Sequence, residues 1–257
     1  MLLTSCLFRF GVVFIFVLLA GPLFACDADR IDASATVEWI ADGDTVKLQD
    51  GRNVRLIGIN TPELNHEGKP SQPYAKMARA ELRKILATSD NRLSLRYGEE
   101  KKDRHNRLLA HLYLPDGRNV NALMVRRGLA VAIVIPPNDW NLDCYRQAEA
   151  QAHAQGSGIW SLPAYRKKDS RRLRGSERGY RFVEGLIERV GKSRHSIWLN
   201  LRGRLAIRID RKDIHRFSHG DFSGLEGRQL IARGWIYQQK GELRMRIRHP
   251  ADLELLL

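Results

Sequence analysis

Cysteine is scarce in this chain, and long apolar runs are rarer still. The 257 residues include three cysteines, Cys6, Cys26 and Cys144, so the chain can hold at most one intramolecular disulfide. Outside the first 25 residues no segment is apolar enough to cross a bilayer, which excludes a second membrane span. No internal sequence repeat relates the two halves of the chain. The length leaves room for two small domains, each with its own core.

The first 25 residues contain a single charged residue, Arg9, followed by the apolar stretch 10–19 and then by Gly21 and Pro22. This pattern predicts a secretory signal peptide over residues 1–25, and hence a periplasmic or secreted protein. A retained membrane anchor is the alternative. The apolar core is short for a span, and Gly21-Pro22 interrupts it.

Removal of this segment leaves Cys26 and Cys144, an even pair in a chain bound for an oxidising compartment. We therefore expect a Cys26–Cys144 disulfide. An alternative exists, because Leu23-Phe24-Ala25-Cys26 loosely resembles a bacterial lipobox, which would leave Cys26 lipidated and the protein anchored through it. Phe24 fits that pattern poorly, which favours the disulfide.

Acidic residues are depleted in the C-terminal part of the chain. Residues 26–165 contain 19 Lys and Arg against 18 Asp and Glu, whereas residues 166–257 contain 23 against 11. The net charge of +14 therefore resides almost entirely after residue 165. Such a division suggests a polyanion-binding appendage on a near-neutral body. A purely solubilising role is the alternative.

Residues 26–162 carry strand signals near 35–39, 46–48, 54–59, 91–97 and 108–114, with turns at Asp42-Gly43 and Asp50-Gly51. Three helical patterns are present. The first follows Pro73. The second has Asn121 as a possible cap and ends at Gly128, and the third has Asp139 as a possible cap and ends at Gly156. Five strands and three helices predict an α+β fold, a five-stranded OB-type barrel with helices packed on it.

Residues 163–179 have no apolar periodicity and many like charges, which indicates a basic linker. Residues 180–257 then predict strands near 181–191, 196–201, 205–210, 228–238 and 242–248, with a short helix near 211–217. Three strands, a helix and two strands is again the order of an OB-like barrel, smaller than the first.

Arg55 lies in an apolar run, Val54 to Ile59, where an unpaired charge would be costly. Carboxylates at Asp42, Asp44 and Glu63 could pair with it, or could hold a cation beside which Arg55 meets a phosphate. In order along the chain stand Asp42-Gly43-Asp44-Thr45, the run from Arg55 to Thr61-Pro62-Glu63, and Asp103 to Arg107. These three motifs, at these spacings, resemble the staphylococcal nuclease family over roughly residues 34–162.

The resemblance implies phosphodiester hydrolysis of DNA and RNA with calcium and 3′-phosphorylated products. Asp44, Asn60 and the Thr61 carbonyl stand where the family's metal ligands would be, with Asp42 orienting metal-bound water. Glu63 is the candidate general base, or orients the attacking water. Arg55 and Arg107 would clamp phosphate oxygens in a bidentate manner that lysine cannot reproduce. Arg104 and His105, beside Arg107, are further candidates for nucleic-acid contact.

Two departures from the family pattern matter. Many members carry aspartate where this chain has Asn60, so calcium affinity should be lower here. Tyrosines of the best-known members align with His105, Ile133 and Ile135, so base stacking should be weaker and no preference for base or strand is carried over.

In the second half, alternation places Arg244, Arg246 and Arg248 on one face of a strand, where they could track a nucleic-acid strand. Neighbouring aromatics could stack on bases, although for the tryptophans a place in the core is the favoured interpretation. Together these features predict an exported, metal-dependent nuclease whose C-terminal domain contributes binding rather than chemistry. The alternative is a non-catalytic nucleic-acid-binding protein with a degenerate nuclease fold. No protein partner follows from the sequence.

Overall fold

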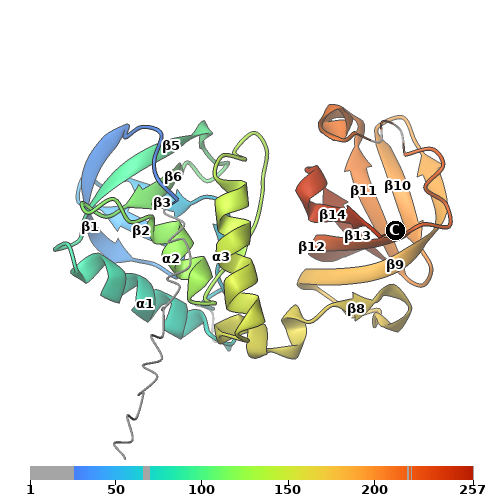
Figure 1. The fold of residues 1–257 in the computed structure, drawn as a ribbon, viewed down its shortest axis with the longest axis horizontal. Helices are drawn as coiled ribbons and strands as arrows, with labels where there is room; N and C mark the ends of the chain where they lie inside the picture. Colours follow the sequence, from blue (N-terminus) through green and yellow to red (C-terminus); the bar gives the residue numbers. More distant parts are fainter. Residues whose placement is uncertain (1–25, 66–69, 219, 221, 257) are drawn as a thin grey trace, which may run out of the picture.

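The computed structural model describes residues 26–256 except 66–69, 219 and 221 (Figure 1). The predicted signal peptide, residues 1–25, lies outside these described residues. The chain forms two β-barrels side by side, with helix α3 between them (Figure 1). Within the described ranges, no helix is long and apolar enough to cross a membrane.

The first barrel closes through five strands in the order β1-β2-β3-β6-β5. Only the β3–β6 pair is parallel. A two-stranded ribbon, β4 with β7, and three helices complete this unit, which confirms the predicted α+β, OB-type fold. The elements are β1 (Ala33–Ile40), β2 (Thr45–Leu48), β3 (Asn53–Leu56), β4 (Ile59–Asn60), α1 (Ala75–Ala87), β5 (Arg92–Lys102), β6 (Leu108–Tyr113), α2 (Val120–Arg126), β7 (Val131–Ala132) and α3 (Leu142–Ala154).

The core of this barrel follows from alternation along its strands. Val46, Leu48, Val54 and Leu56 are completely buried and point inward, and they pack against the apolar face of α1 that includes Leu82. Burial of each such side chain contributes about 1.5–3 kcal/mol of transfer free energy.

Two predicted helix caps were wrong. The cap of α2 is Asn119, whose side chain accepts from the Ala122 N–H at 2.9 Å, whereas Asn121 lies inside the helix. The Asn121 amide instead donates to the Ile57 carbonyl at 2.8 Å and accepts from the Leu112 N–H at 3.0 Å. Helix α3 begins after Asn141, in the left-handed region, rather than at Asp139. Sequence spacing alone could not separate a capping asparagine from one that bonds across the fold.

The structure contains the Cys26–Cys144 disulfide, which joins the segment before β1 to α3. Three side chains also donate to the carbonyl of Cys26: the Tyr113 hydroxyl at 3.1 Å, the Asn119 amide at 3.1 Å and the Asn141 amide at 3.4 Å. The start of the described chain is therefore held by a covalent bond and by three hydrogen bonds.

The second barrel closes through β9, β10, β11, β13 and β12, because β12 pairs with β9. Again only one pair, β11 with β13, is parallel, so the two barrels share one strand order. This confirms the predicted second OB-like barrel. The connection to this barrel contains η1 (Gly158–Ser161) and η2 (Pro163–Tyr165). The elements that follow are β8 (Lys168–Asp169), η3 (Ser170–Arg172), β9 (Gly179–Lys192), β10 (Ser196–Leu201), β11 (Leu205–Asp210), η4 (Arg211–Arg216), β12 (Gln229–Gln239), β13 (Glu242–Ile247), η5 (Pro250–Asp252) and β14 (Leu253–Leu255).

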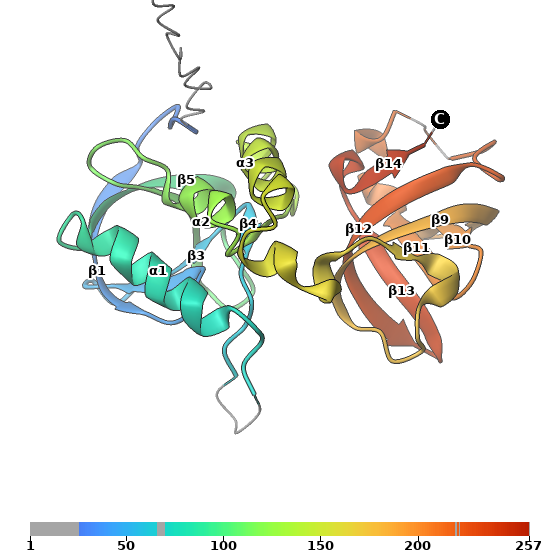
Figure 2. The same cartoon turned by 60° about the horizontal axis from the view of Figure 1, so that its bottom comes forward.

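The segment expected to be a linker folds against the second barrel. Strand β8 pairs with β9 in parallel, Ser170 is buried, and Leu173 belongs to the barrel core. The connection between the barrels runs along the bottom of the molecule as drawn in Figure 1, and in Figure 2 it crosses the middle of the view. It is short and ordered rather than an open tether.

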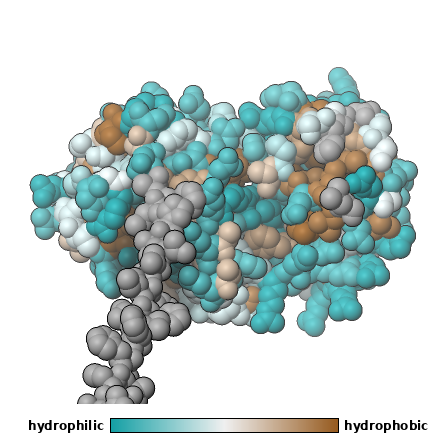
Figure 3. Space-filling model, in the orientation of Figure 1, coloured by the Kyte–Doolittle hydropathy of each residue, from teal (hydrophilic) through white to brown (hydrophobic). Residues whose placement is uncertain are grey.

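Apolar residues also pack where the two units meet. Val131, Ile133 and Ala152 of the first unit form one buried cluster with Trp160 of the connection and Tyr180 of β9. Phe182 of β9 lies 5.6 Å from Trp160, measured between ring centroids. The face drawn in Figure 3 is mainly polar, with small apolar patches on the first unit and larger ones on the second barrel. The two barrels therefore share a small core of their own.

Candidate active site

Asp44 is the centre of the candidate site. It stands at the end of the turn before β2, and its side chain is almost fully buried. Its Oδ2 atom accepts the Thr61 backbone N–H at 2.8 Å and the Thr61 hydroxyl at 3.0 Å. The same oxygen lies 3.1 Å from Nη2 of Arg55. The backbone N–H of Asp44 donates to Asp42 at 3.0 Å, which holds the second carboxylate next to the first.

Arg55 comes from β3, in register with Thr45 on β2, so its guanidinium reaches across to Asp44. Its Nη2 also donates to Oδ1 of Asn60 at 3.3 Å, and its Nη1 donates to the Leu56 carbonyl. Asn60 ends β4 and donates its own amide to the Thr61 carbonyl at 3.2 Å. The buried arginine thus has the anionic partner that its apolar surroundings require.

Glu63 follows β4 in a loop that Gln72 closes. The Glu63 N–H donates to the Gln72 side chain at 3.2 Å, and the Gln72 N–H donates to the Glu63 carbonyl at 3.0 Å. The carboxylate of Glu63 remains exposed. It can therefore reach a bound substrate or a water molecule.

Arg107 is held by Asp103, four residues earlier, at the end of β5. Asp103 accepts from Nε and from Nη2 of Arg107, both at 2.8 Å. It also accepts the backbone N–H groups of His105 and Arg107. Although partial burial opposes the effect, the hydrogen bonds from Arg107 hold the pKa of Asp103 below its usual range. The guanidinium is therefore oriented before any substrate binds.

Arg104 and His105 lie in the same turn and are exposed, with Nε of Arg104 donating to Nε2 of His105 at 3.1 Å. Neither is drawn into the core. Both stand in the turn that also holds Arg107, and their contact with nucleic acid stays a prediction.

The electrostatics join these groups into one site. Burial raises the pKa of Asp44 to about 6, the Arg55 charge opposes this shift, and the Asp42 and Glu63 carboxylates reinforce it. Desolvation and the Asp42 carboxylate raise the pKa of Glu63, against the Arg55 and Arg107 guanidiniums. Three acids and two arginines thus lie within range of each other's charge.

The donor set around Asp44 suits a hard cation. Asp42 and Asp44 carboxylates, the Asn60 amide oxygen and the Thr61 carbonyl are all oxygen donors, which calcium accepts in mixed sets. A cation would also offset the repulsion between the acids. Among the described residues, no three His, Cys, Asp or Glu side chains gather into a metal-binding group, so neutral oxygens would have to complete the shell.

Known proteins resemble the part of the chain that carries most of this site. The family model described as "Staphylococcal nuclease homologue" matches residues 53–162. The chain is 36% identical over 143 residues to the thermonuclease of Staphylococcus intermedius, covering 54% of this chain and 83% of that protein. This chain belongs to the staphylococcal nuclease family. The predicted enzyme class, a nuclease, is confirmed with it.

Other nuclease relatives agree. The thermonuclease of Staphylococcus hyicus is 35% identical over 126 residues, which cover 48% of this chain and 72% of that protein. Endonuclease YncB of Bacillus subtilis is 32% identical over 136 residues, which cover 51% of this chain and 64% of that protein. The family match ends at Leu162 and does not reach the second barrel.

Reasoning from sequence missed two positioning groups in the nuclease domain. Asp103, which orients Arg107, was visible as the acid four residues before it, a spacing typical of a paired arginine. Gln72, which closes the Glu63 loop, had no local signal because its partner is nine residues away.

In the second barrel, the predicted nucleic-acid contacts are ion-paired. Arg244 pairs with Glu242 at 2.9 Å, Arg246 pairs with Asp210, and Arg248 lies 3.5 Å from Asp213. Arg244 and Arg246 share the outer face of β13. Arg248 lies beyond the end of that strand and donates to the Pro136 carbonyl of the nuclease domain at 3.1 Å.

The favoured interpretation of the tryptophans as core residues was wrong for the second barrel. Trp198 lies on the outer face of β10, because its neighbours Ile197 and Leu199 fill the interior. The guanidinium of Arg244 lies 4.8 Å from its ring centroid and that of Arg208 lies 5.9 Å away. Trp235 is also exposed, to 41%. These contacts form a ring flanked by two cations on the barrel surface.

Proposed function

We propose that this chain is a calcium-dependent nuclease that hydrolyses phosphodiester bonds of DNA and RNA at the site around Asp44. The observation that carries the proposal is the convergence of the Asp44–Arg55–Asn60–Thr61 cluster with Glu63 and Arg107 at one end of the first barrel. Phosphodiester cleavage requires an activated water and stabilisation of the charge that develops on the phosphate. This set of side chains can supply both.

Each residue has a distinct role in the proposal. Asp44, the Asn60 amide oxygen and the Thr61 carbonyl would hold calcium, which supplies charge neutralisation at the phosphate when bound, and Asp42 would orient its water. Arg55 and Arg107 would donate to non-bridging oxygens in the transition state. Glu63 would accept a hydrogen bond from the attacking water, orienting it or taking its proton. Burial and the Asp42 carboxylate raise the pKa of Glu63 above its usual value, which makes it a stronger base than a free glutamate.

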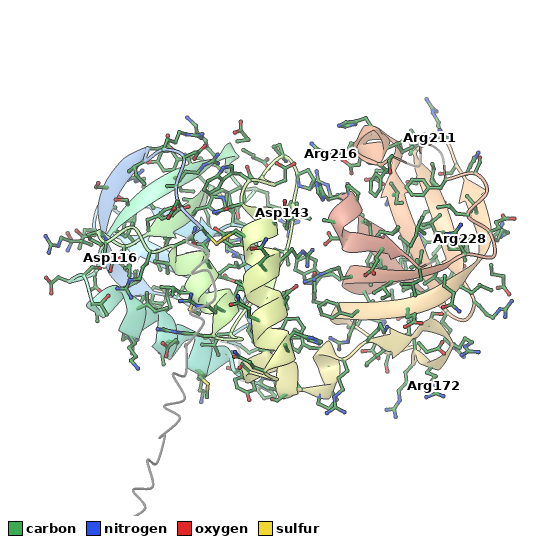
Figure 4. All side chains as sticks on the ribbon, in the orientation of Figure 1. Asp116, Asp143, Arg172, Arg211, Arg216 and Arg228 are labelled. Carbon is green, nitrogen blue, oxygen red and sulfur yellow. A yellow bond between two sulfur atoms is a disulfide. The ribbon has the colours of Figure 1, made fainter. Side chains whose placement is uncertain are left out.

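We propose further that the second barrel aids substrate binding. Trp198, Arg208 and Arg244 form an aromatic and cationic surface on β10, β11 and β13, the strands that lie away from α3 (Figure 1). Arg172, Arg211 and Arg228 add charge at the bottom, top and right of the second barrel as drawn in Figure 4. Trp198 is half-buried. A base can stack on the exposed part of its ring while cations follow the backbone, and this mode tolerates any sequence.

A kinetic comparison tests that role. Trp198→Ala should raise KM for single-stranded DNA and leave kcat unchanged, because stacking is worth about 1–3 kcal/mol per base. Trp39→Ala on β1, where the ring is 52% exposed, is the matched control and should change neither constant. An unchanged KM for Trp198→Ala would exclude this face.

Export completes the proposal. Residues 1–25 have the pattern of a signal peptide, and the Cys26–Cys144 disulfide is compatible with an oxidising compartment. The mass of the protein recovered from the periplasm or medium decides between cleavage before Cys26 with an intact disulfide and a diacylglyceryl group on Cys26.

The competing function is nucleic-acid binding without chemistry. A degenerate nuclease domain would lack the set of arginines and acids that this chain has. This set therefore favours a nuclease over a binding protein without chemistry. Incubating the protein with plasmid, single-stranded DNA and RNA, with calcium or with chelator, tests the proposal. We expect hydrolysis of all three that chelator abolishes; binding without hydrolysis would favour the alternative.

A further inference from the structure

Arg233, on β12 of the second barrel, reaches into the nuclease domain. Its Nη1 and Nη2 atoms lie 2.5 and 2.7 Å from the two carboxylate oxygens of Glu149 on α3. Nη2 also donates to the Ala132 carbonyl at 2.9 Å, and Nε donates to the Tyr180 hydroxyl at 2.9 Å. The ring of Phe182 lies 4.5 Å from the guanidinium carbon. All three nitrogens of a nearly buried arginine are therefore engaged.

Glu149 also contacts the backbone of Ala132. Its Oε1 atom accepts the backbone N–H of Ala132 at 2.8 Å. The N–H and the carbonyl of Ala132 are thus both hydrogen-bonded by a single ion pair, formed by Arg233 of the second barrel and Glu149 of α3. We call these two residues, with Ala132, the Arg233–Glu149 clamp.

The clamp acts on the outer edge of a ribbon that needs support. The Ile133 N–H donates to the Gly58 carbonyl at 3.0 Å, so the neighbouring Ala132 turns its N–H and carbonyl away from β4. In the described part of the chain this ribbon has two strands of two residues each. A two-stranded ribbon is marginally stable alone, and unpaired backbone groups at a buried edge are costly. The clamp side chains make the hydrogen bonds to Ala132 that a third strand would otherwise make.

The ribbon carries the site. Ala132 is in register with Ile59, and Val131 with Asn60. Asn60 accepts from Arg55, and Thr61, the next residue, donates twice to Asp44. The clamp therefore holds the strand that pairs with β4. Strand β4 contains Asn60 and leads into Thr61, and both are proposed calcium ligands.

We propose that Arg233 is a positioning residue for the active site: through Glu149 and Ala132, the second barrel fixes the β4–β7 ribbon and thereby Asn60 and Thr61. Docking of the barrels does not depend on this contact alone. Arg146 pairs with Asp252 at 2.7 Å and also with Glu149 at 3.2 Å, and Arg216 pairs with Asp139 at 3.3 Å. The Arg146–Asp252 and Arg216–Asp139 pairs hold the two domains together without a contact to β7. The second barrel then contributes to turnover as well as to binding, whereas the motif positions predict a role in binding alone.

This inference rests on the proposed function, and its test separates the two. The full chain is compared with Arg233→Met, Arg233→Lys, the double variant Arg233→Met/Glu149→Gln, and Arg216→Met as a control at another interdomain ion pair. Arg216 lies on the side of the second barrel that faces the nuclease domain (Figure 4). The double variant leaves no buried charge unpaired and keeps an acceptor for the Ala132 N–H. It therefore replaces the single variant if that one does not fold.

Two readouts are taken on the folded proteins. Hydrogen exchange followed by mass spectrometry reports on peptides that cover residues 57–63 and 130–135. Steady-state kinetics on a DNA oligonucleotide with calcium gives kcat and KM. Loss of a group that orients metal ligands typically lowers activity by about 10- to 100-fold. We expect Arg233→Met to accelerate exchange in those two peptides and lower kcat by that factor at similar KM, Arg233→Lys to recover part of both, and Arg216→Met to change neither.

Unchanged exchange in residues 57–63 of Arg233→Met or of the double variant would overturn the inference, as would faster exchange there with an unchanged kcat. In either case the clamp would serve docking alone. Absence of calcium-dependent hydrolysis by the unmodified chain would instead overturn the proposed function. The exchange data would then still show whether Arg233 holds the ribbon.

Discussion

Thr61 donates both its backbone N–H and its hydroxyl to a single oxygen of Asp44, at 2.8 and 3.0 Å. These two hydrogen bonds join the turn before β2 to the end of β4. They orient Asp44 and Thr61, two of the proposed calcium ligands, at once. The same pair explains the glycine between the two aspartates. A Cβ atom on Gly43 would lie 2.8 Å from Cγ2 of Thr61 and 2.7 Å from Cβ of Ala78 on α1. Glycine here permits the close approach of turn, ribbon and helix.

Gly43→Ala should therefore lower both stability and activity. Overpacking of a tight interior contact costs about 1–3 kcal/mol, and the displaced Thr61 would no longer align with Asp44. Urea denaturation and steady-state kinetics measure the two effects. Gly191→Ala is the control, because its nearest neighbours lie 3.6 Å away. Adding Ala78→Gly should restore part of the loss; a Gly43→Ala variant as stable and active as the unmodified chain would contradict the proposed packing.

Asn60→Asp should tighten calcium binding. The substitution adds a negative charge among ligands that now include a neutral amide oxygen, and calcium affinity rises with ligand charge. Isothermal titration with calcium measures the dissociation constant directly. Asn65→Asp, in the exposed loop after Glu63, adds the same charge without a ligand position and serves as the control. Equal calcium affinity in Asn60→Asp and the unmodified chain would remove residue 60 from the ligand set.

Stability should fall on acidification because of His111. Burial lowers the pKa of this histidine from 6.5 to about 3, the Arg96 charge adds to the effect, and Nδ1 is paired with the Tyr145 hydroxyl at 2.6 Å. Between those two pKa values the unfolded chain binds a proton that the folded chain does not. The contribution is thus fully present above pH 6.5 and is lost toward pH 3, with a slope on the order of 1 kcal/mol per pH unit.

Urea denaturation at pH 7 and pH 5 tests this, with His111→Asn as the comparison because an amide can still bond to Tyr145 without titrating. The free energy of unfolding should drop more between these pH values in the unmodified chain than in the variant. Parallel pH dependence in the two proteins would mean that His111 does not carry the effect.

The strands and the motif residues were predictable because their signals are local. Alternation places Val46, Leu48, Val54 and Leu56 inside the barrel, and register then places Arg55 across from Thr45. The break between β3 and β4 was not predicted. It occurs at Gly58, whose φ of 79° turns the chain, and the Asn121 amide secures it by bonding to the Ile57 carbonyl from 64 residues away.

The interdomain contacts were equally invisible to sequence reasoning. Arg233 and Glu149 are 84 residues apart, and the arginine nearest to Glu149 in the sequence, Arg146, indicates a local ion pair rather than one with the second barrel. The same holds for Leu173, whose place in a basic segment conceals that it enters the core of the second barrel. Tertiary contacts of this kind decide how the second barrel acts on the nuclease domain, and no local pattern records them.

In our proposal, phosphodiester hydrolysis takes place at the site that Arg107 completes. The most direct test measures kcat of Arg107→Ala on single-stranded DNA with calcium, beside Arg118→Ala, which removes an arginine paired with Asp116 elsewhere on the same domain. Removal of one group that stabilises transition-state charge costs about 10²- to 10³-fold in rate. We predict that loss for folded Arg107→Ala and full activity for Arg118→Ala. Near-full activity of Arg107→Ala would contradict the account.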